Sequence, residues 1–281
     1  MSSAALLGAD FAWPLWNNQE IDDAFEIDQA GGVDGSVITK VSRPWLFGYK
    51  PTKAPNGRSV LILGGGGYTQ LMVGREGIAV ARWLTGLGFT AFVLVHRFPN
   101  ADTGPQAPLD DARQALRLIN EAGSSPSFLG VCGLSSGGHL AAALLSDYPT
   151  VWATSAPIPK LAFAIIGYGP ISSNAAGRSI VADKPPLEPP AKQALYDTVI
   201  PDEQLAHPAP PTFIVYSAND PVVPVVNAYR LTEGLTKAGG SVELHVFADA
   251  PHGFAMDTEG LPVSKWPSLC EGWMQQQGLL E

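Results

Sequence analysis

One stretch of the chain, residues 127–145, constrains the fold more than any other, and it reads SFLGVCGLSSGGHLAAALL. The apolar residues at its start are typical of a short buried strand, and the alanines and leucines at its end are typical of a helix. Only GLSSG lies between them, so the chain must turn sharply. Glycine at positions 133 and 137 removes side chains that would collide there. The pattern G-x-S-x-G between strand and helix predicts a nucleophile elbow with Ser135 at its apex.

A serine hydroxyl is a weak nucleophile unless a base lies beside it and a third group orients that base. His252 follows a predicted strand by a few residues, which places it on a loop at the carboxyl edge of the sheet, where the elbow also lies. Asp220 follows another predicted strand at the same edge. Asp249 is the alternative acid, but it lies so close to His252 in sequence that the loop would have to double back. The predicted base is therefore His252, and the predicted acid is Asp220.

Attack of a serine on an acyl carbon produces an oxyanion, which fixed backbone N–H groups stabilise. One such donor is predicted at Ser136, which follows the nucleophile at the start of the helix. The second is predicted at Gly66 or Gly67, within the run GGGG that follows a buried strand at residues 59–63. A backbone without side chains lets a substrate oxygen approach closely.

The same glycine run has a competing interpretation as a dinucleotide site. Thr69 and Gln70 stand where the third glycine of G-x-G-x-x-G is needed, and no acidic residue occurs between Gly77 and Ala101 to bind a ribose. A metal signature such as H-E-x-x-H is also missing from the sequence. We therefore expect no cofactor and no metal. The net charge of −9, without any run of Lys or Arg, disfavours nucleic acid and anionic membranes as partners.

Predicted strands and helices alternate along most of the chain. The strands are expected at 59–63, 89–95, 128–132, 161–167, 212–216 and 242–247, and the helices at 77–87, 110–122, 139–145, 223–237 and 265–277. This order predicts an α/β fold with a mostly parallel central sheet and helices on both faces. Residues 35–41 and 45–49 are expected to form an antiparallel pair ahead of it.

All 281 residues are expected to form one domain. An N-terminal arm is expected at about 1–34. The proline-rich segment at about 172–211 is too long for a structureless loop and predicts a small helical cap insertion, built around residues 191–197 and 203–206.

Other features set broader limits. Cys132 and Cys270 are expected to be buried thiols rather than a disulfide. Asp110 and Asp111 are interpreted as structural residues at a helix start, where carboxylates interact favourably with the positive end of the helix dipole.

The first nine residues lack the basic region of a secretion signal, and no apolar run is long enough to cross a bilayer, so a cytoplasmic protein is expected. A monomer and a homodimer are both open.

With these residues in place, the chain resembles the bacterial acetylesterase and acetyl xylan esterase-like branch of the α/β-hydrolase superfamily. The resemblance rests on GGGGY, EGIAVARWLTGLGFTAFVLVHR, PLDDARQALRLI, GLSSGGHLAA, PPTFIVYSANDPVVPV, SVELHVFADAPHGF and WPSLCEGWMQQQGLL, which cover roughly residues 59–170 and 210–280. It implies an α/β-hydrolase fold with Ser135 as nucleophile, Asp220 as acid, His252 as base and an oxyanion loop at residues 65–68.

The resemblance further implies a cofactor-free serine carboxylesterase that acts on short acyl esters, often acetyl groups on sugars, through an acyl-enzyme. The expected substrate is a small-molecule or carbohydrate ester, such as acetylated xylan. A serine peptidase-like hydrolase and a longer-chain lipase-like hydrolase are the alternatives, followed by a non-catalytic binding protein on this fold. Two positions depart from the family pattern: Gly64 stands where relatives commonly have Pro or His, and Ser136 where they often have Ala.

Overall fold

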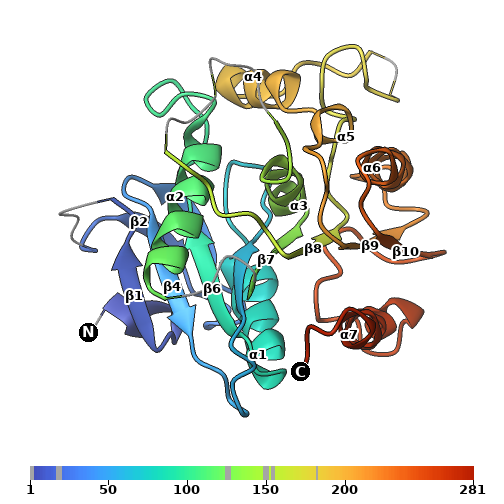
Figure 1. The fold of residues 1–281 in the computed structure, drawn as a ribbon. Coiled ribbons are helices and arrows are strands. Elements are labelled where there is room, and N and C mark those ends of the chain that lie inside the picture. The colour runs from blue at the N-terminus through green and yellow to red at the C-terminus, as the bar shows by residue number, and fades with distance from the viewer. Residues whose placement is uncertain (1–2, 17–20, 124–127, 148–151, 153–155, 182) are drawn as a thin grey trace.

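The computed structural model describes residues 3–16, 21–123, 128–147, 152, 156–181 and 183–281 (Figure 1). Its strands are β1 (Phe11–Pro14), β2 (Phe25–Asp28), β3 (Val37–Val41), β4 (Trp45–Tyr49), β5 (Ser59–Leu63), β6 (Thr90–Val95), β7 (Leu129–Leu134), β8 (Phe163–Gly167), β9 (Thr212–Ser217) and β10 (Val242–Phe247). Its α-helices are α1 (Ala79–Gly86), α2 (Ala107–Glu121), α3 (Ser136–Ala143), α4 (Pro190–Thr198), α5 (Pro201–Gln204), α6 (Val226–Lys237) and α7 (Trp266–Gln276). Short 3₁₀ segments cover Ser3–Leu7 and Pro262–Lys265, and a π-helical turn covers Val73–Ile78.

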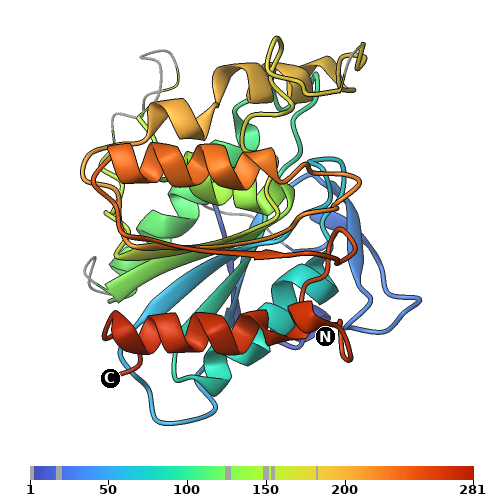
Figure 2. The ribbon, with the colours of Figure 1, turned by 90° about the vertical axis from the view of Figure 1, so that its right-hand side faces the viewer.

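The central sheet has eight strands in the order β1-β4-β6-β5-β7-β8-β9-β10. Every pair from β6 to β10 is parallel, whereas β4 pairs antiparallel with both β1 and β6. Helices α1 and α7 cover one face, and α2, α3 and α6 cover the other (Figure 2). Every residue of β5, β7 and β8 is buried, as expected of parallel strands covered on both faces. The predicted fold class, a mostly parallel sheet between helices, is confirmed.

The predicted pairing of residues 35–41 with 45–49 is wrong. Strand β3 instead pairs with β2 in a separate two-stranded sheet, and β4 lies inside the main sheet between β1 and β6. The five residues of β4 are all buried, whereas β3 exposes two of its five, so only β4 suits an interior position. Within the expected N-terminal arm, β1 forms the edge of the sheet, where Pro14 removes no needed ladder bond. Residues 1–2 and 17–20 of the arm lie outside the described residues.

Two helical segments begin earlier than predicted. The helix expected from residue 77 is preceded by the π-helical turn at Val73–Ile78, which runs directly into α1. Glycine has a low helix propensity, so Gly74 and Gly77 argue against a helical turn here when the sequence alone is considered. Helix α2 begins at Ala107, three residues ahead of the prediction, with a proline in its first turn. The first residue of the elbow stretch, Ser127, lies outside the described residues.

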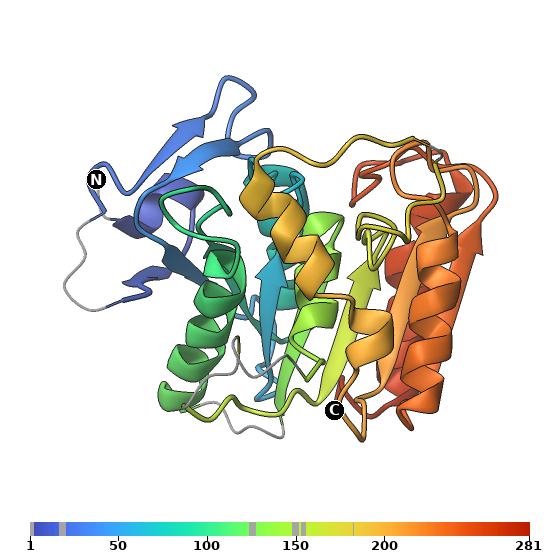
Figure 3. The ribbon, with the colours of Figure 1, turned by 90° about the horizontal axis from the view of Figure 1, so that it is seen from above.

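Helices α4 and α5 occupy the segment expected to form the cap, apart from Ala182, which lies outside the described residues. Each begins with a proline at its first helical position, where the missing N–H is not needed. Figure 3 shows α4 crossing above the carboxyl ends of the central strands. The Nζ of Lys192 in α4 lies 3.7 Å from the point where a Cβ on Gly67 would be. This part of the chain therefore borders the glycine run.

Both cysteines are buried and free, as predicted. Burial raises the pKa of the Cys132 thiol to about 12, so this thiol is protonated at neutral pH. Among the residues that the structure describes, no helix combines the length and apolarity that a membrane span requires.

Candidate active site

The elbow between β7 and α3 forces Ser135 into an unusual backbone conformation. Its φ of 54° and ψ of −125° lie outside the regions that non-glycine residues prefer. The turn is possible because a Cβ on Gly137 would overlap the Leu63 carbonyl oxygen, and a Cβ on Gly133 would overlap the carbonyl oxygen of Gly137. Glycine at both positions thus allows strand, turn and helix to pack closely, and it leaves the serine hydroxyl at the apex.

The structure brings Ser135, His252 and Asp220 together from three separate loops. The Ser135 Oγ lies 2.9 Å from His252 Nε2, and His252 Nδ1 lies 2.7 Å from Asp220 Oδ2. A carboxylate only accepts hydrogen bonds, so Nδ1–H donates to Asp220 and the free Nε2 accepts from the serine hydroxyl. This tautomer leaves a lone pair directed at the hydroxyl proton, as a general base requires.

Asp220 is fixed by more than the imidazole. Its Oδ1 accepts hydrogen bonds from the amides of Val222 and Val223, at 2.8 and 2.9 Å, and its side chain is fully buried. The alternative acid, Asp249, instead accepts a hydrogen bond from Asn219 Nδ2 at 2.7 Å. The carboxylate beside His252 is therefore that of Asp220.

The three predicted oxyanion donors have different surroundings. Ser136 is the first residue of α3, and its amide has no intrahelical acceptor. The Gly66 amide has no hydrogen-bond partner among the described residues. The Gly67 amide, by contrast, already donates to the Ser136 hydroxyl at 3.0 Å. The amides of Gly66 and Ser136 are thus the two that are open to a substrate oxygen.

Glu76, which belongs to none of the predicted sites, is only 4% exposed. It accepts hydrogen bonds from the Gly65 amide at 2.6 Å and from the Tyr168 hydroxyl at 3.0 Å. Burial raises the pKa of this carboxyl group, and the two hydrogen bonds partly offset that rise. The signal in the sequence is a single acidic residue, next to Arg75, in the mostly apolar segment LMVGREGIAVA that follows the glycine run.

His139, one helical turn after the nucleophile, joins the glycine run to α4. Its Nε2 donates to the Val199 carbonyl at 3.0 Å, so Nδ1 must accept from the Tyr68 hydroxyl at 2.9 Å. Complete burial lowers the pKa of His139 to about 4, which keeps the ring neutral. This histidine is therefore a structural link rather than the base.

A cavity of about 320 Å³ opens at the serine. It is lined by Gly66, Gly67, Gln70, Met72, Arg75, Glu76, Ser135, Val222, His252 and Gly253. The described part of the chain contains no cluster of three His, Cys, Asp or Glu side chains that could hold a metal ion.

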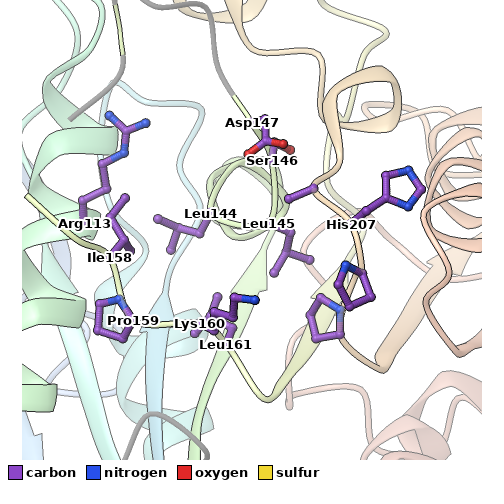
Figure 4. Close-up of a pocket in the computed structure, with 13 residues that line it drawn as sticks. Arg113, Leu144, Leu145, Ser146, Asp147, Ile158, Pro159, Lys160, Leu161 and His207 are labelled. Atoms are coloured by element: carbon purple, nitrogen blue, oxygen red, sulfur yellow. The ribbon is translucent and has the colours of Figure 1, made fainter. Parts of the chain in front are cut away.

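A second, larger cavity of about 580 Å³ lies away from this chemistry (Figure 4). Its walls come from the segments that precede β8 and β9 and from the end of α3, so it opens at the amino edge of the sheet. Ser146 in its wall donates to the Ala142 carbonyl at 3.0 Å, and among the described residues no hydrogen bond joins it to His207, which lines the same cavity. We assign the candidate active site to the smaller cavity, because it contains the hydrogen-bonded serine.

Comparisons with known proteins identify the family of this chain. A family model described as alpha/beta hydrolase fold matches residues 95–256, which include all three of Ser135, Asp220 and His252. The chain therefore belongs to the alpha/beta hydrolase fold family.

Three relatives are informative. An acetylxylan esterase from Xylanibacter ruminicola is 27% identical over 209 residues, which are 73% of this chain and 42% of that protein. Endo-1,4-beta-xylanase B from Butyrivibrio fibrisolvens is 25% identical over 228 residues, 76% of this chain and 35% of that protein. The crystal structure of an acetyl ester-xyloside bifunctional hydrolase from Caldicellulosiruptor lactoaceticus matches with a TM-score of 0.73 and 27% identity over 97% of this chain and 98% of that chain. The matched region thus spans less than half the length of the two relatives found by sequence.

Proposed function

We propose that this protein is a serine carboxylesterase that hydrolyses short-chain acyl esters, acetyl esters first among them, through a covalent acyl-enzyme. The observation that carries the proposal is the hydrogen-bonded chain from Ser135 through His252 to Asp220, within a family of hydrolases. An acetylxylan esterase among the relatives supports the ester class.

The reaction proceeds in two halves. Ser135 Oγ attacks the ester carbonyl carbon while its proton passes to His252 Nε2, and the developing oxyanion lies between the amides of Gly66 and Ser136. The carbon–oxygen bond to the alcohol then breaks, and His252 gives its proton to the departing alcohol. A water molecule, deprotonated by His252, attacks the acyl-enzyme, the acid is released, and Ser135 regains its proton. Asp220 holds the imidazole in the required tautomer throughout.

The lining of the cavity favours a short acyl group. Among the described residues that line it, the larger apolar side chains are Met72 and Val222, and the rest are glycines and polar residues. Each buried methylene of a longer chain would gain about 0.8 kcal/mol only where apolar surface covers it. We therefore infer that binding improves little beyond a few carbons. An acetylated carbohydrate is the natural substrate class we favour, because all three relatives are named for xylan or xylosides and two of the names include acetyl esters.

Glycoside cleavage is the alternative that the xylanase relative raises. That reaction typically needs two carboxyl groups flanking the scissile bond. Among the described residues that line the cavity, Glu76 is the single acid, and both of its oxygens are already hydrogen-bonded. The site is therefore better suited to acyl transfer.

A series of p-nitrophenyl esters from acetate to laurate tests the proposal, with Ser135→Ala as the matched inactive variant. We expect the highest kcat/KM at two to four acyl carbons, and a loss of several orders of magnitude in the variant without a change in fold. A maximum at eight carbons or more would indicate a lipase-like enzyme, and release of aminoacyl groups from p-nitroanilides would indicate a peptidase. Acetate release from acetylated xylan, measured beside p-nitrophenyl xyloside, tests the carbohydrate substrate.

A further inference from the structure

The carboxyl group of Glu76 lies between the two loops that carry the candidate catalytic groups. It lines the cavity at Ser135, yet none of the proton or acyl transfers described above uses it. Burying a carboxyl group is costly unless hydrogen bonds compensate. Here both oxygens have partners, and those partners belong to different loops. This arrangement suggests a task beyond packing.

One oxygen of Glu76 fixes the loop of the predicted oxyanion donors. Its Oε2 accepts the Gly65 amide at 2.6 Å. A Cβ on Gly65 would lie 2.5 Å from both Glu76 Oε2 and Ser135 Cβ, so this residue is held between the carboxyl group and the nucleophile. The peptide plane after Gly65 carries the Gly66 amide, and it must keep its direction to meet a substrate oxygen. The bond to Glu76 holds the preceding peptide in place.

The other oxygen is connected through Tyr168 to the base loop, which is the segment after β10 that carries His252. The Tyr168 hydroxyl donates to Glu76 Oε1 at 3.0 Å and accepts from the Ala255 amide at 3.1 Å. The Tyr168 ring also packs edge-on against the His252 ring, with centroids 5.3 Å apart. A Cβ on Gly253 would lie 3.6 Å from Glu76 Oε1. The glutamate thus lies beside the loop at Gly253 and is joined to it through the Tyr168 hydroxyl.

The neighbouring Arg75 makes a parallel connection, because its Nη2 donates to the Gly253 carbonyl at 3.2 Å and its Nε to Asp257 at 2.8 Å. Both residues lie on the π-helical turn, a feature found often at functional sites. Tyr168 has a positive φ of 35°, which is strained for a tyrosine. Two unusual backbone segments therefore hold Glu76 and Tyr168 where these hydrogen bonds can form.

We propose that Glu76, acting through Tyr168, is a positioning residue that holds the oxyanion loop and the base loop in register around Ser135. The inference rests on the proposed function, since it gives Ser135, His252 and the Gly66 amide their catalytic roles. Glu76 itself touches no reacting atom.

The test compares Glu76→Gln and Tyr168→Phe with Tyr49→Phe. Glutamine has the shape of glutamate but offers an N–H₂ donor in place of one of the two acceptors, so one bond of the connection fails. Tyr168→Phe removes the hydroxyl and leaves the Gly65 bond intact. Tyr49→Phe is the matched control, because that tyrosine is also buried and donates to a backbone carbonyl, Leu7, at 2.9 Å, in a part of β4 away from the site.

Two rates are measured for each protein: turnover of p-nitrophenyl acetate, and covalent labelling by a fluorophosphonate. In the labelling step Ser135 Oγ bonds to phosphorus, fluoride leaves, and His252 takes the proton, so the rate reports the activated serine without a natural substrate. We expect kcat and the labelling rate to fall at least about tenfold in both variants, with KM within about threefold of wild type. The Tyr49→Phe control should keep wild-type rates, even if its melting temperature falls by as much as that of the two test variants.

The outcomes separate this inference from the proposed function. Wild-type labelling and kcat in a folded Glu76→Gln and in Tyr168→Phe would overturn the inference, as would a rise in KM with kcat unchanged. If Glu76→Gln does not fold, Tyr168→Phe alone tests the inference, and wild-type rates in that variant would overturn it. A wild-type protein that neither hydrolyses esters nor reacts with the fluorophosphonate would instead overturn the proposed function, and this inference with it.

Discussion

Asp220 Oδ2 lies 2.7 Å from His252 Nδ1, although Asp249 is far nearer to that histidine along the chain. The carboxylate of Asp249 is bonded to Asn219 instead. The pairing follows from topology, because β9 and β10 are parallel neighbours and the loops after them meet at one edge of the sheet. A partner from the adjacent loop reaches the imidazole without requiring the base's own loop to fold back.

Replacing each of these carboxylates tests the pairing. Asp220→Asn should lower kcat by about 10³- to 10⁴-fold, because an amide no longer enforces the tautomer in which Nε2 accepts the serine proton. Asp249→Asn should stay within about threefold of wild type, since its loss affects only a hydrogen bond to Asn219. Steady-state kinetics on p-nitrophenyl acetate measures both. Equal losses in the two variants would argue against Asp220 as the acid.

Gly65→Ala should abolish turnover, whereas Gly272→Ala should not. The added methyl at residue 65 would lie 2.5 Å from the Cβ of Ser135 and 2.8 Å from the Leu134 carbonyl oxygen, so either the nucleophile or the glycine loop must move. A Cβ on Gly272 in α7 meets nothing within 4 Å, and alanine there should raise the free energy of unfolding by about 0.5 to 1 kcal/mol. Kinetics and urea unfolding of both variants check this, and an active Gly65→Ala enzyme would contradict it.

The central strands and the elbow were predictable because their signals are local. An apolar run such as that of β5, followed at once by glycines, indicates a buried strand that ends at a tight turn. The GLSSG turn likewise combines strand, glycine and helix signals within a few residues. The order of these elements then implies parallel crossovers. Each inference needs only neighbours in the sequence.

The N-terminal pairings were not predictable in this way. Whether β3 pairs with β2 or with β4 depends on which surface remains uncovered once the sheet has formed, and no turn signal within four or five residues decides it. Buried charges escape sequence analysis for a related reason. Glu76 and Asp111 look like surface residues, and only the packed structure supplies the donors that make their burial tolerable.

Asp111 illustrates how much such a residue can contribute to stability. Its fully buried carboxylate pairs with Arg97 at 2.6 Å and accepts the Trp16 indole N–H at 2.9 Å. Asp111→Asn should lower the free energy of unfolding by about 2 to 4 kcal/mol, because it leaves the guanidinium without its counter-charge in a largely enclosed place. The exposed pair of Glu26 and Lys40 is the control, and Glu26→Gln should cost less than about 0.5 kcal/mol. Urea unfolding at neutral pH distinguishes the two variants. An unchanged free energy of unfolding in Asp111→Asn would show that the buried pair adds no stability.

The buried His139 predicts a loss of stability in acid. Burial lowers its pKa from 6.5 to about 4 in the folded protein, so between these values the unfolded chain binds the proton and the folded protein does not. Stability from this group is complete above about pH 6.5 and is lost as the pH falls, by about 2 kcal/mol at pH 5. His96, whose pKa burial also lowers, acts in the same direction.

His139→Gln tests this prediction. The variant should be less stable than wild type at pH 8, because its bonds to Tyr68 and Val199 are weakened. It should nevertheless lose less stability than wild type between pH 8 and pH 5, since only the His96 contribution remains. Urea unfolding of both proteins at the two pH values measures the difference, and equal losses would mean that His139 accepts its proton in the folded state as readily as in the unfolded chain.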